Sequence, residues 1–149
     1  MTGIFSTPPF NMEYVKQRTA DDLPSPLATH RTLHYFQHAL GAIDRSHIPI
    51  KAPAQYQDAC RNQKGFISQN CLFICSFDFF FAYALTGWEG SASDARVYHE
   101  AVRTVEDPLV IPPASYLLAD GGYPHCEELL TPYRNMCYHL AERGRVNLW

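Results

Sequence analysis

Two aspartates, Asp44 and Asp120, each follow a short apolar run that has the composition of a buried β-strand. A buried carboxylate at the end of such a strand needs a partner, because an unpaired charge is too costly to keep out of water. For one such aspartate alone, capping of the next turn is the more common role. Two such aspartates in the same setting instead favour a divalent cation that both of them bind. A ligand set made only of oxygen atoms favours Mg²⁺ or Mn²⁺.

The elements that must position these aspartates can be predicted from the apolar pattern and the turn signals. The composition predicts four strands, a helix between the third and fourth strands, and a second helix after the last strand. The expected strands span residues 39–50, 67–77, 79–86 and 116–120, and the expected helices span residues 95–104 and begin at 127–130.

This order of elements predicts an α/β fold with a mixed sheet of RNase H-like type. Three strands form a meander, and after the helix the fourth strand returns beside the first. A crossover of this kind between parallel strands is almost always right-handed. The first and fourth strands are then parallel neighbours, so Asp44 and Asp120 would emerge side by side at the carboxyl edge.

Three histidines at intervals of four residues form another pattern that could do chemistry. If residues 29–40 form a helix, His30, His34 and His38 share one face of it. They then form either a metal site or the solvated side of a helix packed through its aromatic residues.

The overall composition limits the kinds of protein that this chain can be. Its 149 residues, 46% of them hydrophobic, predict one domain, and a net charge of -3 provides no general attraction to nucleic acid or anionic membrane. No export signal is visible, and the longest apolar run, at residues 77–85, is too short to span a bilayer. Five cysteines fit a reducing compartment. We therefore expect a nuclear or cytoplasmic protein with no membrane contact.

Five segments of the chain resemble the nuclease domain of PIF/Harbinger-type DDE transposases, in family order over residues 36–142. They are Leu40-Gly41-Ala42-Ile43-Asp44 with Ser46-His47-Ile48, Arg61-Asn62-Gln63-Lys64-Gly65-Phe66 with Ser68 and Asn70, Ala84-Leu85-Thr86-Gly87-Trp88-Glu89-Gly90-Ser91-Ala92 with Asp94, Arg96 and Val97, Tyr116-Leu117-Leu118-Ala119-Asp120-Gly121-Gly122-Tyr123-Pro124, and Pro132-Tyr133-Arg134 with Tyr138-His139-Leu140.

The resemblance implies a divalent-metal-dependent DNA endonuclease or transposase that cuts or joins phosphodiester bonds. Asp44 and Asp120 would be the first two members of its acidic triad and would hold Mg²⁺ or Mn²⁺. Asp94 matches a further acidic position, which is either a metal-site neighbour or the cap of the helix that it opens. The basic turn at Arg61 and Lys64 would lie near the DNA backbone; without the resemblance it is simply a solvated hairpin connection.

Two features depart from the family pattern. Arg45 stands where the family usually has glycine, and its guanidinium either pairs with Asp44 or contacts a phosphate. The third acid of the family, a glutamate on a later helix, is expected well after Leu140; Glu142 imitates it but comes too early. The resemblance thus implies a partial nuclease domain at residues 36–149, incomplete at its C-terminus and preceded by an extended or irregular lead-in at residues 1–35.

Two alternatives remain open. The chain is either such a nuclease or a catalytically inactive, transposase-derived remnant that acts as a DNA-binding or protein-binding module. A separate DNA-binding partner protein is compatible with both. An unrelated α/β domain with a phosphate-binding turn at Gly121 and Gly122 is a third reading, which lacks the extended glycine-rich loop of such sites.

Overall fold

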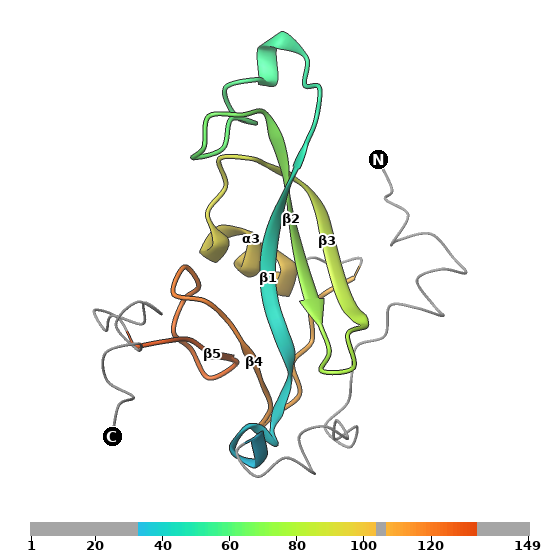
Figure 1. The fold of residues 1–149 in the computed structure, drawn as a ribbon, viewed down its shortest axis with the longest axis vertical. Helices are drawn as coiled ribbons and strands as arrows, with labels where there is room; N and C mark the ends of the chain where they lie inside the picture. Colours follow the sequence, from blue (N-terminus) through green and yellow to red (C-terminus); the bar gives the residue numbers. More distant parts are fainter. Residues whose placement is uncertain (1–32, 104–106, 134–149) are drawn as a thin grey trace, which may run out of the picture.

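A computed structural model of the chain describes residues 33–103 and 107–133 (Figure 1). Most of the expected lead-in at residues 1–35, and the motif residues from Arg134 onward, Glu142 among them, lie outside the described part. None of the helices in that part is long and apolar enough to cross a membrane. The elements in chain order are η2 (Leu33–Phe36), β1 (Ala39–Pro49), η3 (Ala54–Tyr56), β2 (Ser68–Cys75), β3 (Phe81–Glu89), α3 (Asp94–Arg103), β4 (Tyr116–Leu118) and β5 (Leu129–Leu130).

The five strands form one mixed sheet in the order β3-β2-β1-β4-β5. β1, β2 and β3 form an antiparallel meander, whereas β1 pairs parallel with β4 and β4 pairs parallel with β5. The predicted α/β class, the mixed sheet and the parallel pairing of the first and fourth strands are therefore confirmed.

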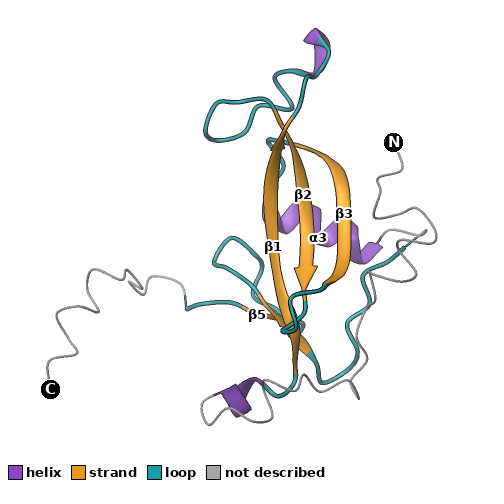
Figure 2. Ribbon diagram, turned by 45° about the vertical axis from the view of Figure 1, so that its right-hand side comes forward, coloured by secondary structure: helices purple, strands orange, loops and turns teal. Residues whose placement is uncertain are grey.

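Helix α3 lies against one face of the meander (Figure 2). It contributes Val97, Tyr98 and Ala101 to the same buried cluster as Ile43 of β1 and Leu117 of β4. Because side chains alternate between the two faces of a strand, the odd-numbered residues of β1 face this helix. The even-numbered residues of β1, from Ala42 to Ile48, are exposed on the opposite face.

Three sequence-based expectations are wrong in detail. Asp44 lies in the middle of β1 and not at its end, since β1 continues to Pro49 along β2. Residues 127–130 do not begin a helix, because Leu129 and Leu130 pair with β4. Within the expected helix at 29–40, a short 3-10 helix ends at Phe36 and Ala39 already belongs to β1.

Candidate functional site

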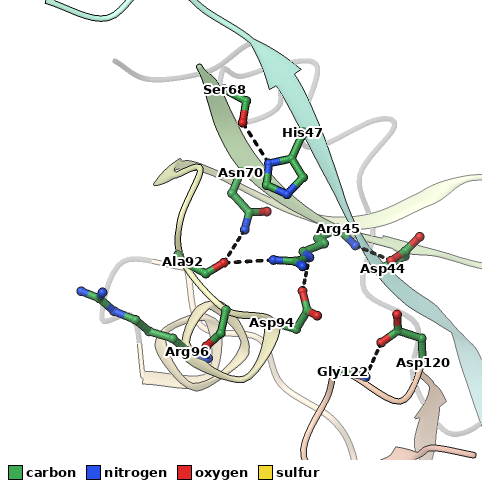
Figure 3. A network of polar contacts seen from close by, with 11 residues as sticks. Asp44, Arg45, His47, Ser68, Asn70, Ala92, Asp94, Arg96, Asp120 and Gly122 are labelled. Atoms are coloured by element: carbon green, nitrogen blue, oxygen red, sulfur yellow. Dashed lines mark hydrogen bonds and ion pairs between the residues drawn. The ribbon is translucent and has the colours of Figure 1, made fainter. Parts of the chain in front are cut away.

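The parallel register of β1 and β4 determines how Asp44 and Asp120 are related. Ala42 pairs with Leu118, and there β4 ends while β1 runs on. Two residues further along each chain come Asp44 and Asp120, and both are exposed. The first position is thus held within a strand and the second on the turn that leaves β4, as Figure 3 shows.

Each of these two carboxylates is oriented by a backbone amide. Asp44 Oδ1 accepts the N–H of Arg45 at 2.7 Å. Asp120 Oδ1 accepts the N–H of Gly122 at 2.9 Å, which closes a tight turn after β4 (Figure 3). In both cases one oxygen is engaged by the backbone, which leaves the second oxygen of the carboxylate available as a ligand.

Asp94 lies close to the same turn but is buried, with only 8% of its surface exposed. A Cβ atom placed on Gly122 would collide with Asp94 Oδ2 and would lie 3.1 Å from Asp120 Oδ1. The two carboxylates therefore converge on a space that only glycine leaves open. Burial raises the pKa of Asp94, and the charges of Asp120 and Asp44 raise it further, whereas Arg45 lowers it.

The partner of Arg45 is Asp94, and this corrects the sequence-based alternative that Arg45 pairs with Asp44. Its Nε forms an ion pair with Asp94 Oδ1, and its Nη1 donates to the carbonyl of Ala92 at 3.0 Å (Figure 3). A pair with Asp44 is excluded because consecutive residues of β1 point to opposite faces. The guanidinium is used on the helix face to bind the start of α3.

A second contact fastens the same loop to the sheet. Asn70 of β2 is fully buried and donates its side-chain amide to the carbonyl of Ala92 at 3.1 Å. Ser93 caps α3, since its hydroxyl accepts the N–H of Arg96 at 3.4 Å and its carbonyl accepts the N–H of Val97. Asp94 is thus the first helical residue and not the cap, and its carboxylate is free to face Arg45 and Gly122.

Tyr123 is a component of the site that belongs to one of the sequence motifs but for which no role was predicted. The residue is 1% exposed, and its hydroxyl has no hydrogen-bond partner among the described residues. Burial raises its pKa, as do the nearby charges of Asp94, Asp44 and Asp120. Tyr123 directly follows Gly122, on which Asp94 and Asp120 converge. A tyrosine directly after a strand-terminal Asp-Gly-Gly turn is the signal that could have identified it.

The donor chemistry of this region fits a hard divalent cation only in part. Asp44 and Asp120 offer carboxylate oxygens, which Mg²⁺ and Mn²⁺ prefer. Within the described ranges, however, no three His, Cys, Asp or Glu side chains are grouped closely enough to hold a metal ion. That finding also covers His34 and His38, while His30 lies outside those ranges.

The predicted basic turn is a well-ordered hairpin connection built around Asn62. This buried side chain accepts the N–H groups of Lys64 and Phe66 at 3.0 and 3.3 Å and donates to Ser68 Oγ at 3.1 Å. Arg61 donates Nη1 to the carbonyl of Gly65 at 2.8 Å, which ties its guanidinium to the turn itself. Lys64 is exposed and lines a groove against β1.

Residues 43–148 match the model of the family described as DDE superfamily endonuclease. Because this match covers more than half of the chain, the protein belongs to that family, and the membership expected from the sequence motifs is confirmed.

The names of similar known proteins are consistent with this family. "Putative nuclease HARBI1" of Rattus norvegicus is 33% identical over 93 residues, which are 62% of this chain and 27% of the relative. The protein of the same name from Homo sapiens is 30% identical over 93 residues, with the same shares of both chains. The chain thus matches about a quarter of the length of these relatives. No solved structure matches it.

Proposed function

We propose that the chain contains the first two acids of a divalent-metal-dependent nuclease site that acts on DNA phosphodiester bonds. The observation that carries the proposal is the parallel register of β1 and β4, in which Ala42 pairs with Leu118. Asp44 and Asp120 follow these two paired residues by the same number of positions. Membership of the DDE superfamily endonucleases and the likeness to nucleases support DNA as the substrate.

The proposed fold is RNase H-like. The sheet order β3-β2-β1-β4-β5, with an antiparallel meander followed by two parallel strands, supports this assignment. In it, Asp120 and Asp94 converge on Gly122, and Asp44 lies on the neighbouring strand β1.

Asp44 and Asp120 would hold Mg²⁺ or Mn²⁺ through the carboxylate oxygens that the backbone does not engage. The bound cation would lower the pKa of an attacking water or 3′-hydroxyl and offset charge on the phosphate. The chain itself supplies orientation, because the N–H groups of Arg45 and Gly122 fix the two carboxylates. Asp94 acts as a neighbour that Arg45 holds in place, with Oδ2 near the turn.

The competing proposal is a transposase-derived module that binds DNA or protein without cleaving. The ion pair of Arg45 with Asp94 favours it, because a guanidinium occupies one of the three carboxylates and brings a positive charge beside a cation site. Glu142 imitates the third acid of the family but comes earlier than the family pattern requires, and it lies outside the described residues.

Cleavage of supercoiled plasmid by the purified chain with Mn²⁺ or Mg²⁺ separates the two proposals. The nuclease proposal predicts nicking that EDTA abolishes and that Asp44→Asn and Asp120→Asn each reduce by about 100-fold or more, as expected for loss of a metal ligand. Glu127→Gln, an exposed acid on another part of the surface, is the matched control and should keep full activity. A folded protein that binds DNA and leaves the plasmid intact with both cations would favour the non-cleaving module.

A further inference from the structure

A groove lies between β1 and the hairpin turn that follows Arg61. It is lined by residues of β1 and of the turn, namely Arg45, Ser46, His47, Gln63, Lys64 and Phe66. One end of it is formed by Arg45, which directly follows Asp44 in the strand but points to the opposite face of the sheet. With about 3.3 Å per residue, His47 lies about 10 Å along β1 from Asp44.

The charge of this groove sets it apart from the rest of the chain. Its lining contains Arg45, His47 and Lys64 and no acid, although the whole chain carries a net charge of -3. A second groove, beside β4, is lined by Glu127 and Glu128 and by no basic residue. Because Arg45 is paired with Asp94, the free positive charge of this groove is that of Lys64, and no acid of the lining opposes it.

Not every basic residue near the groove can contact a ligand. The guanidinium of Arg45 is bound to Asp94 and Ala92, and that of Arg61 is bound to the carbonyl of Gly65. Lys64 is exposed and forms no ion pair with any described residue. Its ammonium group is thus the cation in the groove that can meet a phosphate.

His47 provides a second donor. Its Nδ1 lies 3.0 Å from Ser68 Oγ, and the same oxygen accepts the side-chain amide of Asn62. A Ser68 hydroxyl that donates to Nδ1 leaves the imidazole proton on Nε2, the tautomer that can donate to a phosphate. Burial and the charges of Arg45 and Lys64 lower the pKa of His47, so the ring donates as a neutral imidazole at neutral pH.

Phe66 gives the groove an aromatic surface. It is 38% exposed, and its backbone N–H donates to Asn62 Oδ1. An exposed ring beside cationic donors is the arrangement that nucleic-acid-binding proteins use to stack a base while a phosphate is held next to it.

We propose that this groove binds one nucleotide of a DNA strand, with its phosphate on Lys64 and His47 and its base against Phe66. The nucleotide would lie on the face of β1 that carries Arg45 and His47, within about 10 Å of Asp44 along the strand. The inference rests on the proposed function, since it assigns the neighbouring substrate subsite. It replaces the sequence-based expectation that Arg61 and Arg45 contact the DNA directly.

Fluorescence anisotropy with a labelled single-stranded DNA oligonucleotide tests this assignment on the full chain, in EDTA so that no cleavage or metal binding contributes. Lys64→Ala should weaken binding about fivefold and lower the slope of log affinity against log salt by about 0.7, the value for one phosphate contact. Phe66→Ala should weaken it about tenfold and Phe66→Tyr should restore it. Lys51→Ala, a matched change on an exposed lysine outside the groove, should bind like the wild type.

Several outcomes would overturn the assignment. One is a loss of DNA affinity in Lys51→Ala as large as that in Lys64→Ala, and another is wild-type affinity in Lys64→Ala or Phe66→Ala. Tighter binding of an RNA of the same sequence would also contradict it, as would full displacement of the DNA by inorganic phosphate together with unchanged affinity in Phe66→Ala. Unchanged melting curves of the variants exclude misfolding as the cause of a loss. Asp44→Asn should bind at least as tightly as the wild type in EDTA, so failure of the groove and failure of the catalytic site are distinguishable.

Discussion

Arg45 of β1 and Asp94 of α3 form an ion pair on the helix face of the sheet, directly beside the position at which Asp44 points to the other face. The side chains of the pair are 21% and 10% exposed. The same arginine also binds Ala92. One residue that departs from the family pattern therefore fastens α3 to the sheet and places a positive charge beside the three aspartates.

Arg45→Met should lower the free energy of unfolding by about 2 kcal/mol at pH 7, a value between those of exposed and buried ion pairs. Burial already raises the pKa of Asp94 and Arg45 lowers it, so the variant raises this pKa further. A raised folded-state pKa means that stability falls as the pH rises through it. The loss of stability caused by Arg45→Met should therefore become smaller as the pH falls toward about 4, near the unfolded pKa, because Asp94 is then protonated and no longer pairs as an ion.

Urea denaturation at pH 7 and pH 4 measures this difference, with Arg96→Met as the matched control. Arg96 is exposed and lies over the ring of Trp88 at 5.5 Å, an interaction of about 0.5 kcal/mol at such a site. Equal losses at both pH values in Arg45→Met would contradict an ionic role of the pair.

Gly122→Ala should destabilise the protein by about 1–3 kcal/mol, as overpacking of a filled space does. The new methyl group would collide with Asp94 Oδ2. Gly121→Ala is the control, because a Cβ at that position meets nothing within 4 Å. Chemical denaturation of both variants tests the convergence of Asp94 and Asp120 on Gly122; the same stability in both would argue against it.

Tyr123→Phe should change stability by less than about 1 kcal/mol, since the hydroxyl that it removes makes no hydrogen bond within the described part of the chain. Tyr123→Ala should cost about 3–5 kcal/mol, because it empties the space of a fully buried ring. Thermal and urea unfolding distinguish the two. A large loss of stability in Tyr123→Phe would contradict a hydroxyl without a hydrogen-bond partner.

Asn62→Ala should cost about 2 kcal/mol, because it leaves two backbone N–H groups and Ser68 without their partner. It should also weaken DNA binding at least as much as Lys64→Ala, since the turn that presents Lys64 and Phe66 loses its centre. Asn62→Asp keeps the acceptor for the turn and should retain more affinity than Asn62→Ala. Equal affinity of the wild type and Asn62→Ala in anisotropy would contradict this role of the turn.

The elements with long local patterns could be predicted from the sequence. The strand expected at residues 39–50 is β1 (Ala39–Pro49), and the helix expected at 95–104 is α3 (Asp94–Arg103). β5 was missed because Leu129 and Leu130 carry no periodic signal and become a strand only by pairing with β4. The helix considered for residues 29–40 does not reach its expected end, because Ala39 is buried in β1 and pairs with Tyr116.

The sequence predicts the acidic residues of the candidate site but not the contacts that they make. Asp44 and Asp120 are visible because each follows an apolar run, and the order of elements predicts that β1 and β4 are neighbours. The partner of Arg45 could not be predicted, since it depends on how α3 docks on the sheet. Alternation along β1 nevertheless excludes Asp44 as that partner, and this argument was available from the sequence alone.

The shift of the melting temperature on addition of Mg²⁺ or Mn²⁺ tests the central claim most directly. The account predicts a rise of about 5 °C at saturating cation for the wild type, and no rise for Asp44→Asn or Asp120→Asn. Glu127→Gln should shift like the wild type. A melting temperature that excess cation leaves unchanged, or a shift that survives both aspartate substitutions, would contradict a metal site shared by Asp44 and Asp120.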